Sequence, residues 1–173
     1  ILKQDPYESM LGFIISANNN IKRIQKIMFA IRQNFGKNMG EYYTFPTAQE
    51  LSKATEQDFK NMGAGYRAKY LVEATKQLAN ADYESLRKMS TDELNKYLLA
   101  IMGVGQKVAD CIMLFAFSKG NVFPVDTWIE KVYCSYFKEE HNRVIIRKNL
   151  LNTFGENSGY IQQYLFYSQR ENS

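Results

Sequence analysis

Apolar residues recur at helical spacing along almost the whole chain. One example is the repeat Ile21, Ile24, Met28, Ile31 and Phe35, whose steps of three or four positions mark one face of an α-helix. No stretch alternates apolar and polar residues with the period of two that a half-buried strand needs. The pattern therefore predicts an all-α fold of about ten short helices.

Capping signals place the ends of several of these helices. Thr47 with Glu50 and Ser90 with Glu93 have the spacing of a capping box, in which two side chains satisfy the first backbone N–H groups of a helix. Thr55 with Asp58 is a weaker variant of the same pattern. Asp126 is a natural N-cap for another helix. The longer helices are expected over residues 6–16, 21–35, 66–78, 91–102, 106–117, 127–137, 143–154 and 160–170.

The chain shows no internal boundary. No linker rich in Gly, Pro or Ser interrupts its 173 residues, and no internal repeat is visible. We expect one helical region over residues 1–173. Within it, residues 6–102 form mostly one lobe, residues 91–117 a helix-hairpin-helix, and residues 121–173 a set of C-terminal helices. The start, Ile1-Leu2, is neither a signal peptide nor an initiator methionine, so we expect the chain to be an excerpt.

Composition excludes several classes of protein. Two cysteines cannot form a disulfide scaffold or bind a four-thiolate iron–sulfur cluster, and with one histidine no metal site is expected. No apolar run approaches the length of a membrane span. We expect an intracellular protein, in the cytoplasm or nucleoid of a bacterium or in the nucleus of a eukaryote. The formal net charge of +4 permits a polyanionic partner without requiring one.

The most informative segment is the hairpin Gly103-Val104-Gly105 between two predicted helices. Glycines permit positive φ and bare backbone, so N–H groups at the start of the second helix can face a phosphate. Lys107 lies in the first turn of that apolar helix, where the helix dipole disfavours a cation. It can be an amine nucleophile. The alternatives are an ordinary helical corner in a core and a surface lysine that only contacts phosphate.

Asp126 follows the proline-fixed segment Phe123-Pro124-Val125. An aspartate at a helix start is more often a structural cap than a catalytic group. Paired with Lys107, however, it would give a nucleophile together with a carboxylate that stabilises positive charge on a sugar.

These segments resemble the DNA glycosylase superfamily that carries a helix-hairpin-helix, a Gly/Pro-rich loop and an aspartate. Two further segments resemble the 8-oxoguanine DNA glycosylases within it. The residues that carry the resemblance are 16–24, 63–70, 102–112 and 125–126. The resemblance implies a two-lobed helical fold, a monomer, and duplex DNA containing 8-oxoguanine opposite cytosine as the partner.

The resemblance also implies a bifunctional glycosylase and AP lyase. Lys107 would attack C1′ of the damaged nucleotide, expel the base and form a Schiff base, after which β-elimination nicks the strand. Asp126 would steady the oxocarbenium-like sugar. The nucleotide must first leave the base stack. No cofactor is required for this chemistry, although a monovalent or divalent cation could bind hairpin carbonyls near Gly103–Gly105.

The remaining roles are carried over position by position. The base pocket would contain Cys111, Gln162 and Phe166. The residues that would contact the opposite cytosine or the DNA backbone are Asn18, Arg23, Tyr66, Arg67, Gly103, Val104, Gly105 and Gln106.

The chain departs from the family in three places. Trp128 stands where a histidine often contacts phosphate, and Ile101-Met102 replaces the usual Leu-Pro. The N-terminal β-sheet lobe, which in the family supplies the acceptor for N7–H of 8-oxoguanine, is absent from these residues. Two alternatives stay open: a helix-hairpin-helix glycosylase for other bases, such as alkylated bases or mismatched adenine, and a DNA-binding module without catalysis.

Overall fold

The computed structural model describes residues 1–171, and side chains up to residue 168, so that the last two residues of the expected helical region lie outside the described residues. The described elements are α1 (Pro6–Ser16), α2 (Ile21–Phe35), α3 (Ala48–Leu51), α4 (Glu56–Asn61), α5 (Arg67–Leu78), α6 (Tyr83–Lys88), α7 (Thr91–Leu99), α8 (Gln106–Phe117), α9 (Thr127–Tyr136), α10 (Arg143–Phe154), the short 3-10 helix η1 (Gly155–Asn157) and α11 (Ser158–Glu171). Between residues 1 and 171 there is no strand, only an isolated bridge between Asn38 and Tyr43. The all-α prediction is confirmed.

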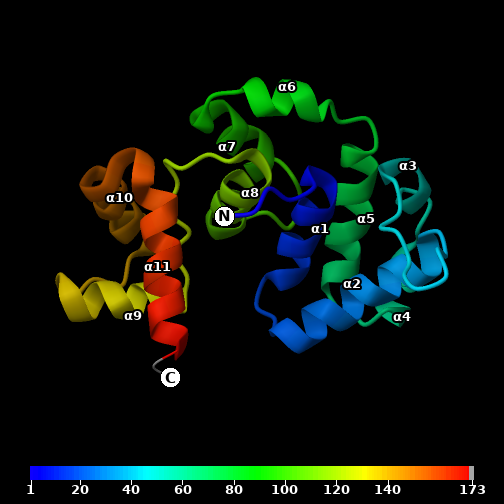
Figure 1. The fold of residues 1–173 in the computed structure, drawn as a ribbon, viewed down its shortest axis with the longest axis horizontal. Helices are drawn as coiled ribbons and strands as arrows, with labels where there is room; N and C mark the ends of the chain where they lie inside the picture. The colour runs from blue at the N-terminus through cyan, green and yellow to red at the C-terminus, as the bar shows by residue number, and fades with distance from the viewer. Residues whose placement is uncertain (172–173) are drawn as a thin grey trace.

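The helices form two groups, which Figure 1 shows side by side: α1–α8 make a large lobe, and α9–α11 make a small lobe. Each lobe buries its own apolar side chains. One core cluster runs from Tyr7 to Val122, and the second is built around Phe123, Ile129 and Leu150. Because α8 belongs to the first cluster, the hairpin is part of the large lobe.

Local signals explain most helix boundaries. Thr47, Thr55 and Ser90 each accept a hydrogen bond from the backbone three residues on, and the acid there bonds back to the cap, as the sequence predicts. Helix α8 has the predicted bounds. Helix α6, a six-residue helix capped by Asp82, was not predicted from the sequence. The prediction for α7 extended too far, because the chain leaves the helix at Leu99 through a tight turn.

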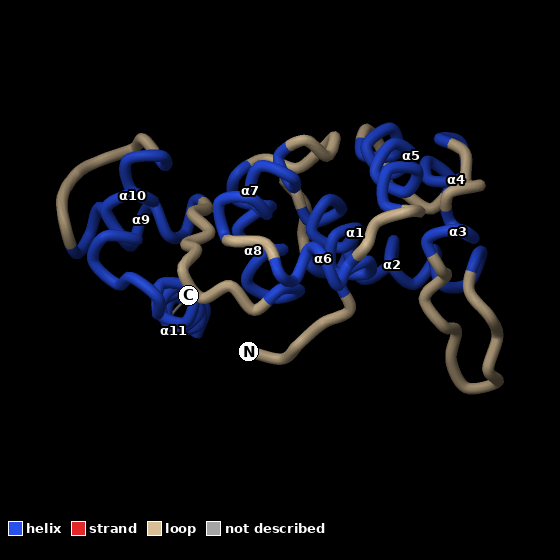
Figure 2. Tube along the Cα trace, turned by 90° about the horizontal axis from the view of Figure 1, so that it is seen from above, coloured by secondary structure: helices blue, strands red, loops and turns tan. Residues whose placement is uncertain are grey.

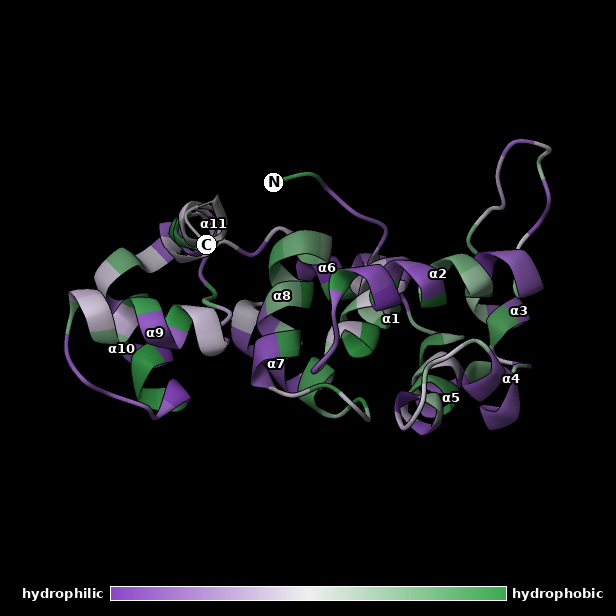
Figure 3. Ribbon diagram, turned by 90° about the horizontal axis from the view of Figure 1, so that it is seen from below, coloured by the Kyte–Doolittle hydropathy of each residue, from purple (hydrophilic) through white to green (hydrophobic). Residues whose placement is uncertain are grey.

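A loop over residues 36–47 joins α2 to α3 and projects from the large lobe (Figure 2). Most of it is hydrophilic, as the colours of Figure 3 show. This loop lies at the end of the molecule away from the small lobe, so it does not take part in the junction between the lobes.

The junction between the lobes is narrow and specific. Arg147 of α10 forms two hydrogen bonds with the fully buried Asp110 of α8, at 2.6 and 2.8 Å. Burial raises the pKa of the Asp110 carboxyl, and the hydrogen bonds from Arg147 and Gln106 counteract that rise. A Cβ on Gly159 would lie 2.4 Å from Leu114 Cδ1, so glycine lets α11 approach α8. These contacts fix where the small lobe lies against the hairpin helix.

No helix in the described part of the chain is long and apolar enough to cross a membrane.

Candidate active site

The hairpin has the geometry of a phosphate cradle. Gly103 has φ +88°, and a Cβ there would lie 2.8 Å from the Cβ of Tyr70, so the turn requires glycine for two reasons. Val104 is buried and anchors the turn in the core. Exposed Gly105 caps α8 without a side-chain hydrogen bond, which leaves the first N–H groups of the helix open to a ligand. Gln106 turns inward instead, donating to Asn95 and Asp110.

Lys107 follows in the first turn of α8 and is half-buried. Cys111, one turn later on the same helix, is buried. Burial raises the pKa of the Cys111 thiol to about 11, although the neighbouring Lys107 acts to lower it. The thiol is therefore protonated at neutral pH.

The two oxygens of the Asp126 carboxylate differ in their hydrogen bonds. Oδ1 accepts hydrogen bonds from the backbone N–H groups of Trp128 and Ile129, both at 3.0 Å, and so caps α9. Oδ2 has no hydrogen-bond partner among the described residues. One oxygen is structural, and the other is available to a ligand.

Lys107 and Asp126 come from different lobes and meet in one cleft of about 1190 Å³. Of the other predicted site residues, Asn18 and Phe166 also line it. The complete lining is Ser16, Ala17, Asn18, Asn19, Asn20, Ile21, Lys22, Gln25, Lys107, Val108, Asp126, Thr127, Trp128, Arg143 and Phe166. An amine, a carboxylate with a free oxygen and an aromatic ring thus line the same space.

The Asn-rich loop, residues 17–20, forms the large-lobe rim of the cleft. Arg67 forms hydrogen bonds with the backbone of this loop. Asn18 has φ +48°, a left-handed conformation that asparagine tolerates better than most residues. The Arg67 guanidinium, 1% exposed, donates to the carbonyl oxygens of Ala17 and Asn18. In this conformation Arg67 supports the loop, and its contact with the opposite base stays a prediction.

Arg23 and Tyr66 lie beside this loop. Arg23 is exposed and donates from Nη2 to the carbonyl of Gly63 at 2.9 Å. The Tyr66 ring is 57% exposed and stacks on the Arg67 guanidinium at 4.4 Å. The structure therefore brings four of the predicted DNA-contacting residues to one rim, and of these only Asn18 lines the cleft itself: they are Asn18, Arg23, Tyr66 and Arg67.

Gln162 and Phe166 lie one turn apart on α11. Phe166 is half-buried at the cleft, whereas Gln162 is buried and accepts a hydrogen bond from the side chain of Gln163 at 2.6 Å. Gln162 and Cys111 are buried and do not line the cleft.

The cleft also contains Arg143, which the sequence analysis did not single out. The signal was present. Arg143 is the first residue of α10, and a cation at a helix N-terminus is the same anomaly that drew attention to Lys107.

The described residues contain no group of three His, Cys, Asp or Glu side chains that could hold a metal ion. The hairpin offers carbonyl oxygens instead. Those of Gly103 and Val104 accept no hydrogen bond from any described residue, as a cation site built from backbone oxygens requires.

The family model of the HhH-GPD superfamily base excision DNA repair proteins matches residues 11–154. The chain belongs to this superfamily. An N-glycosylase/DNA lyase OGG1 of Arabidopsis thaliana is 33% identical over 98% of the chain and 51% of its own length. For the N-glycosylase/DNA lyase of Saccharomyces cerevisiae the identity is 35%, over 76% of the chain and 40% of that protein.

A solved structure is more similar still. The 8-oxoguanine glycosylase/lyase of Clostridium acetobutylicum, in complex with double-stranded DNA containing cytosine opposite 8-oxoguanine, is 44% identical with a TM-score of 0.94. The match covers 99% of this chain and 62% of that one. The predicted resemblance to 8-oxoguanine glycosylases of the HhH-GPD superfamily is confirmed. The chain spans about half the length of the curated relatives named above.

Proposed function

We propose that this chain forms the catalytic helical region of a bifunctional DNA glycosylase and AP lyase that excises 8-oxoguanine opposite cytosine. The observation that carries the proposal is the cleft in which Lys107 and Asp126 meet from separate lobes. A DNA-binding module would need the hairpin but neither of these side chains. The similarity to glycosylase/lyases of three organisms supports the double activity. The similarity to the 8-oxoguanine glycosylase/lyase of Clostridium acetobutylicum supports the substrate.

In the proposed reaction the uncharged amine of Lys107 attacks C1′ of the extruded nucleotide. The N–C1′ bond forms as the glycosidic bond breaks, and the electron pair of that bond leaves with the base, which takes up a proton. Positive charge develops on the sugar, and the free oxygen of Asp126 stabilises it. The sugar ring then opens as the C1′–O4′ bond breaks, which gives a Schiff base between C1′ and Lys107. Loss of a C2′ proton expels the 3′ phosphate, and hydrolysis of the Schiff base releases Lys107.

The base pocket and the opposite-base contacts belong to the same proposal. Phe166 would stack on the extruded base, with Cys111 and Gln162 behind it. Asn18 would fill the gap in the duplex and Tyr66 would stack beside it. Arg23 and Arg67 would read the edge of the cytosine, and Arg67 would first have to release the carbonyls of Ala17 and Asn18.

The backbone of the hairpin would bind phosphate through the first N–H groups of α8. A cation at the carbonyls of Gly103 and Val104 stays a prediction, and the amine chemistry does not pass through it. The acceptor for N7–H of 8-oxoguanine is assigned to no described residue. A substrate in chromosomal DNA would place the protein inside the cell.

Borohydride trapping tests the proposal. On duplex DNA with 8-oxoguanine opposite cytosine, the wild-type chain should form a covalent adduct and nick the strand. Lys107→Gln should do neither while retaining DNA affinity, because the hairpin is unchanged. An adduct formed equally well by Lys107→Gln would refute the assignment. DNA binding without any adduct in the wild type would indicate a non-catalytic module.

A further inference from the structure

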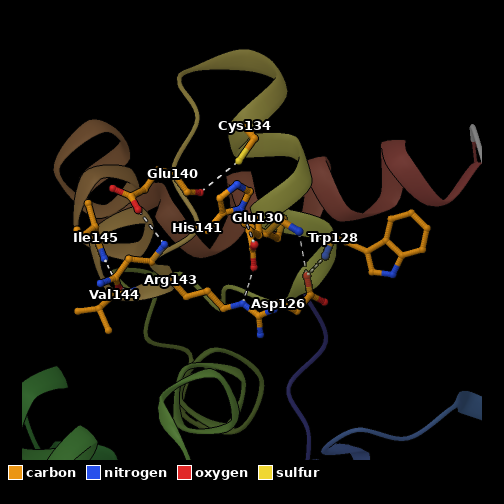
Figure 4. A network of polar contacts seen from close by, with 11 residues as sticks. Asp126, Trp128, Glu130, Cys134, Glu140, His141, Arg143, Val144 and Ile145 are labelled. Carbon is orange, nitrogen blue, oxygen red and sulfur yellow. Dashed lines mark hydrogen bonds and ion pairs between the residues drawn. The ribbon is translucent and has the colours of Figure 1, made fainter.

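Arg143 lies at the small-lobe rim of the cleft. It is the first residue of α10, and its side chain, 51% exposed, lines the same space as Lys107 and Asp126. Figure 4 shows the side chain running from α10 along α9 toward Asp126. This position needs an explanation, because the dipole of α10 disfavours a cation at its N-terminus.

Glu130 of α9 supplies that explanation. Its Oε2 accepts a hydrogen bond from Arg143 Nε at 2.7 Å, and its Oε1 lies 3.1 Å from Nδ1 of His141. The Glu130 side chain is only 18% exposed and is held from both sides. The carboxylate therefore fixes the guanidinium by its inner nitrogen (Figure 4).

The outer edge of the guanidinium is left open. Nη1 and Nη2 of Arg143 have no partner among the described residues, and together they present the planar fork that matches two oxygens of a phosphate. Of the other two cations that line the cleft, Lys107 is the nucleophile and Lys22 lies on the opposite, large-lobe rim. Arg143 is thus the small-lobe cation that lines the cleft and has no role in the proposed reaction.

The position fits a defined ligand. A nucleotide whose C1′ reaches Lys107 brings two flanking phosphates with it, and each must find a donor or stay in water. We propose that Arg143 binds one of the two phosphodiesters that flank the extruded nucleotide, and that Glu130 is the positioning residue that aims its fork. The proposal rests on the proposed function for the presence of an extruded nucleotide, but not on the identity of the base.

A chemical double-mutant cycle tests it. The DNA is a duplex with a tetrahydrofuran abasic analogue, which has no base to excise, and either flanking phosphate is replaced by an uncharged methylphosphonate. For the wild type, one of the two replacements should weaken binding roughly tenfold, the size of one charge-assisted hydrogen-bonded contact. For Arg143→Gln that same replacement should cost less than about twofold, because the contact is already lost.

Salt dependence gives a second readout. Arg143→Gln should lower the slope of log affinity against log salt by about 0.9, the value for one phosphate contact. Lys76→Gln is the matched control. It removes a cation that is also paired with a carboxylate, Glu73, on the surface of α5 outside the cleft. Equal slopes and equal methylphosphonate penalties in the two variants would overturn the proposal.

Two substitutions at Glu130 separate positioning from charge. Glu130→Ala should abolish the methylphosphonate effect, because the fork is no longer held in place, and should weaken overall affinity less than Arg143→Gln does, because a negative charge is also removed. Glu130→Gln keeps an acceptor for Arg143 Nε and should restore the methylphosphonate effect. Retention of the full effect in Glu130→Ala would show that Glu130 does not aim the fork. Failure of the wild type to trap 8-oxoguanine DNA would refute the proposed function. The double-mutant cycle would still test Arg143, because it measures binding to DNA that has no base to excise.

Discussion

The charged groups on the two rims of the cleft differ in how far they are paired with protein partners. On the large-lobe rim, the guanidinium of Arg67 is buried and bound to the carbonyls of Ala17 and Asn18. On the small-lobe rim, the charged groups are only half engaged. Asp126 uses one oxygen to cap α9, and Arg143 uses one nitrogen to bind Glu130.

This difference separates support from binding. A guanidinium that has lost its water and gained carbonyl partners contributes to the stability of a loop. A group with open hydrogen-bonding capacity at a cleft is ready for a ligand. We therefore expect substitution of the buried Arg67 to change folding first, and substitutions on the small-lobe rim to change function in an intact fold.

Asp126→Asn should give the largest effect on function. Asparagine caps a helix as well as aspartate does, so the free energy of unfolding should change by no more than about 0.5 kcal/mol. Excision of 8-oxoguanine in single-turnover assays should slow by a factor of about 100 or more, because the charge that stabilises the sugar is removed. A folded variant that excises at the wild-type rate would remove Asp126 from the mechanism.

Arg67→Met should give the largest effect on stability. It leaves the Asn18 carbonyl without a donor and the Ala17 carbonyl with only the Tyr66 hydroxyl, at 3.4 Å. The free energy of unfolding should fall by about 3 kcal/mol in urea titrations. Arg143→Gln, on the other rim, should change it by less than about 0.5 kcal/mol. Similar losses in the two variants would abolish the contrast between the rims.

Arg23→Ala should have a smaller and more selective effect. Its guanidinium is exposed beside the Asn-rich loop, so it can reach a base without unfolding the rim. The preference for excision opposite cytosine over adenine should fall roughly tenfold, within the range of one charged base contact. Lys76→Gln again serves as the control. An equal loss of affinity for both opposite bases would assign Arg23 to the phosphate backbone.

The smallest expected effect concerns the two cysteines, which should differ in how fast they react with an alkylating reagent. Because burial raises the pKa of the Cys111 thiol to about 11, its thiolate is scarce at pH 8 and becomes abundant only as the pH approaches that value. Iodoacetamide should modify half-buried Cys134 first, as mass spectrometry of the two peptides would show. Faster labelling of Cys111 than of Cys134 at pH 8 would mean that the buried Cys111 thiol becomes exposed to solvent.

Local chemistry made much of the fold predictable. The capping boxes at Thr47, Thr55 and Ser90 and the Asp126 cap depend on residues three positions apart, which a sequence displays directly. Helix α6 was missed because it is short, although its cap at Asp82 was visible.

The site was predictable only where a motif carried it. Lys107 and Asp126 stand in recognisable segments, and the structure brings them into one cleft. The burial of Arg67 depends on a loop 50 residues away, and no local pattern signals that contact. The place of Arg143 depends on how α10 packs against α9, which the pair with Glu130 fixes across 13 residues.

The central claim is that Lys107 is the amine that bonds to the sugar while it faces Asp126 across the cleft. Mass spectrometry of the borohydride-reduced adduct tests it without any substitution. After digestion of protein and DNA, the deoxyribose-derived mass should lie on Lys107, in the peptide that follows the hairpin. Attachment to another amine, such as Lys22 on the opposite rim, would contradict the account.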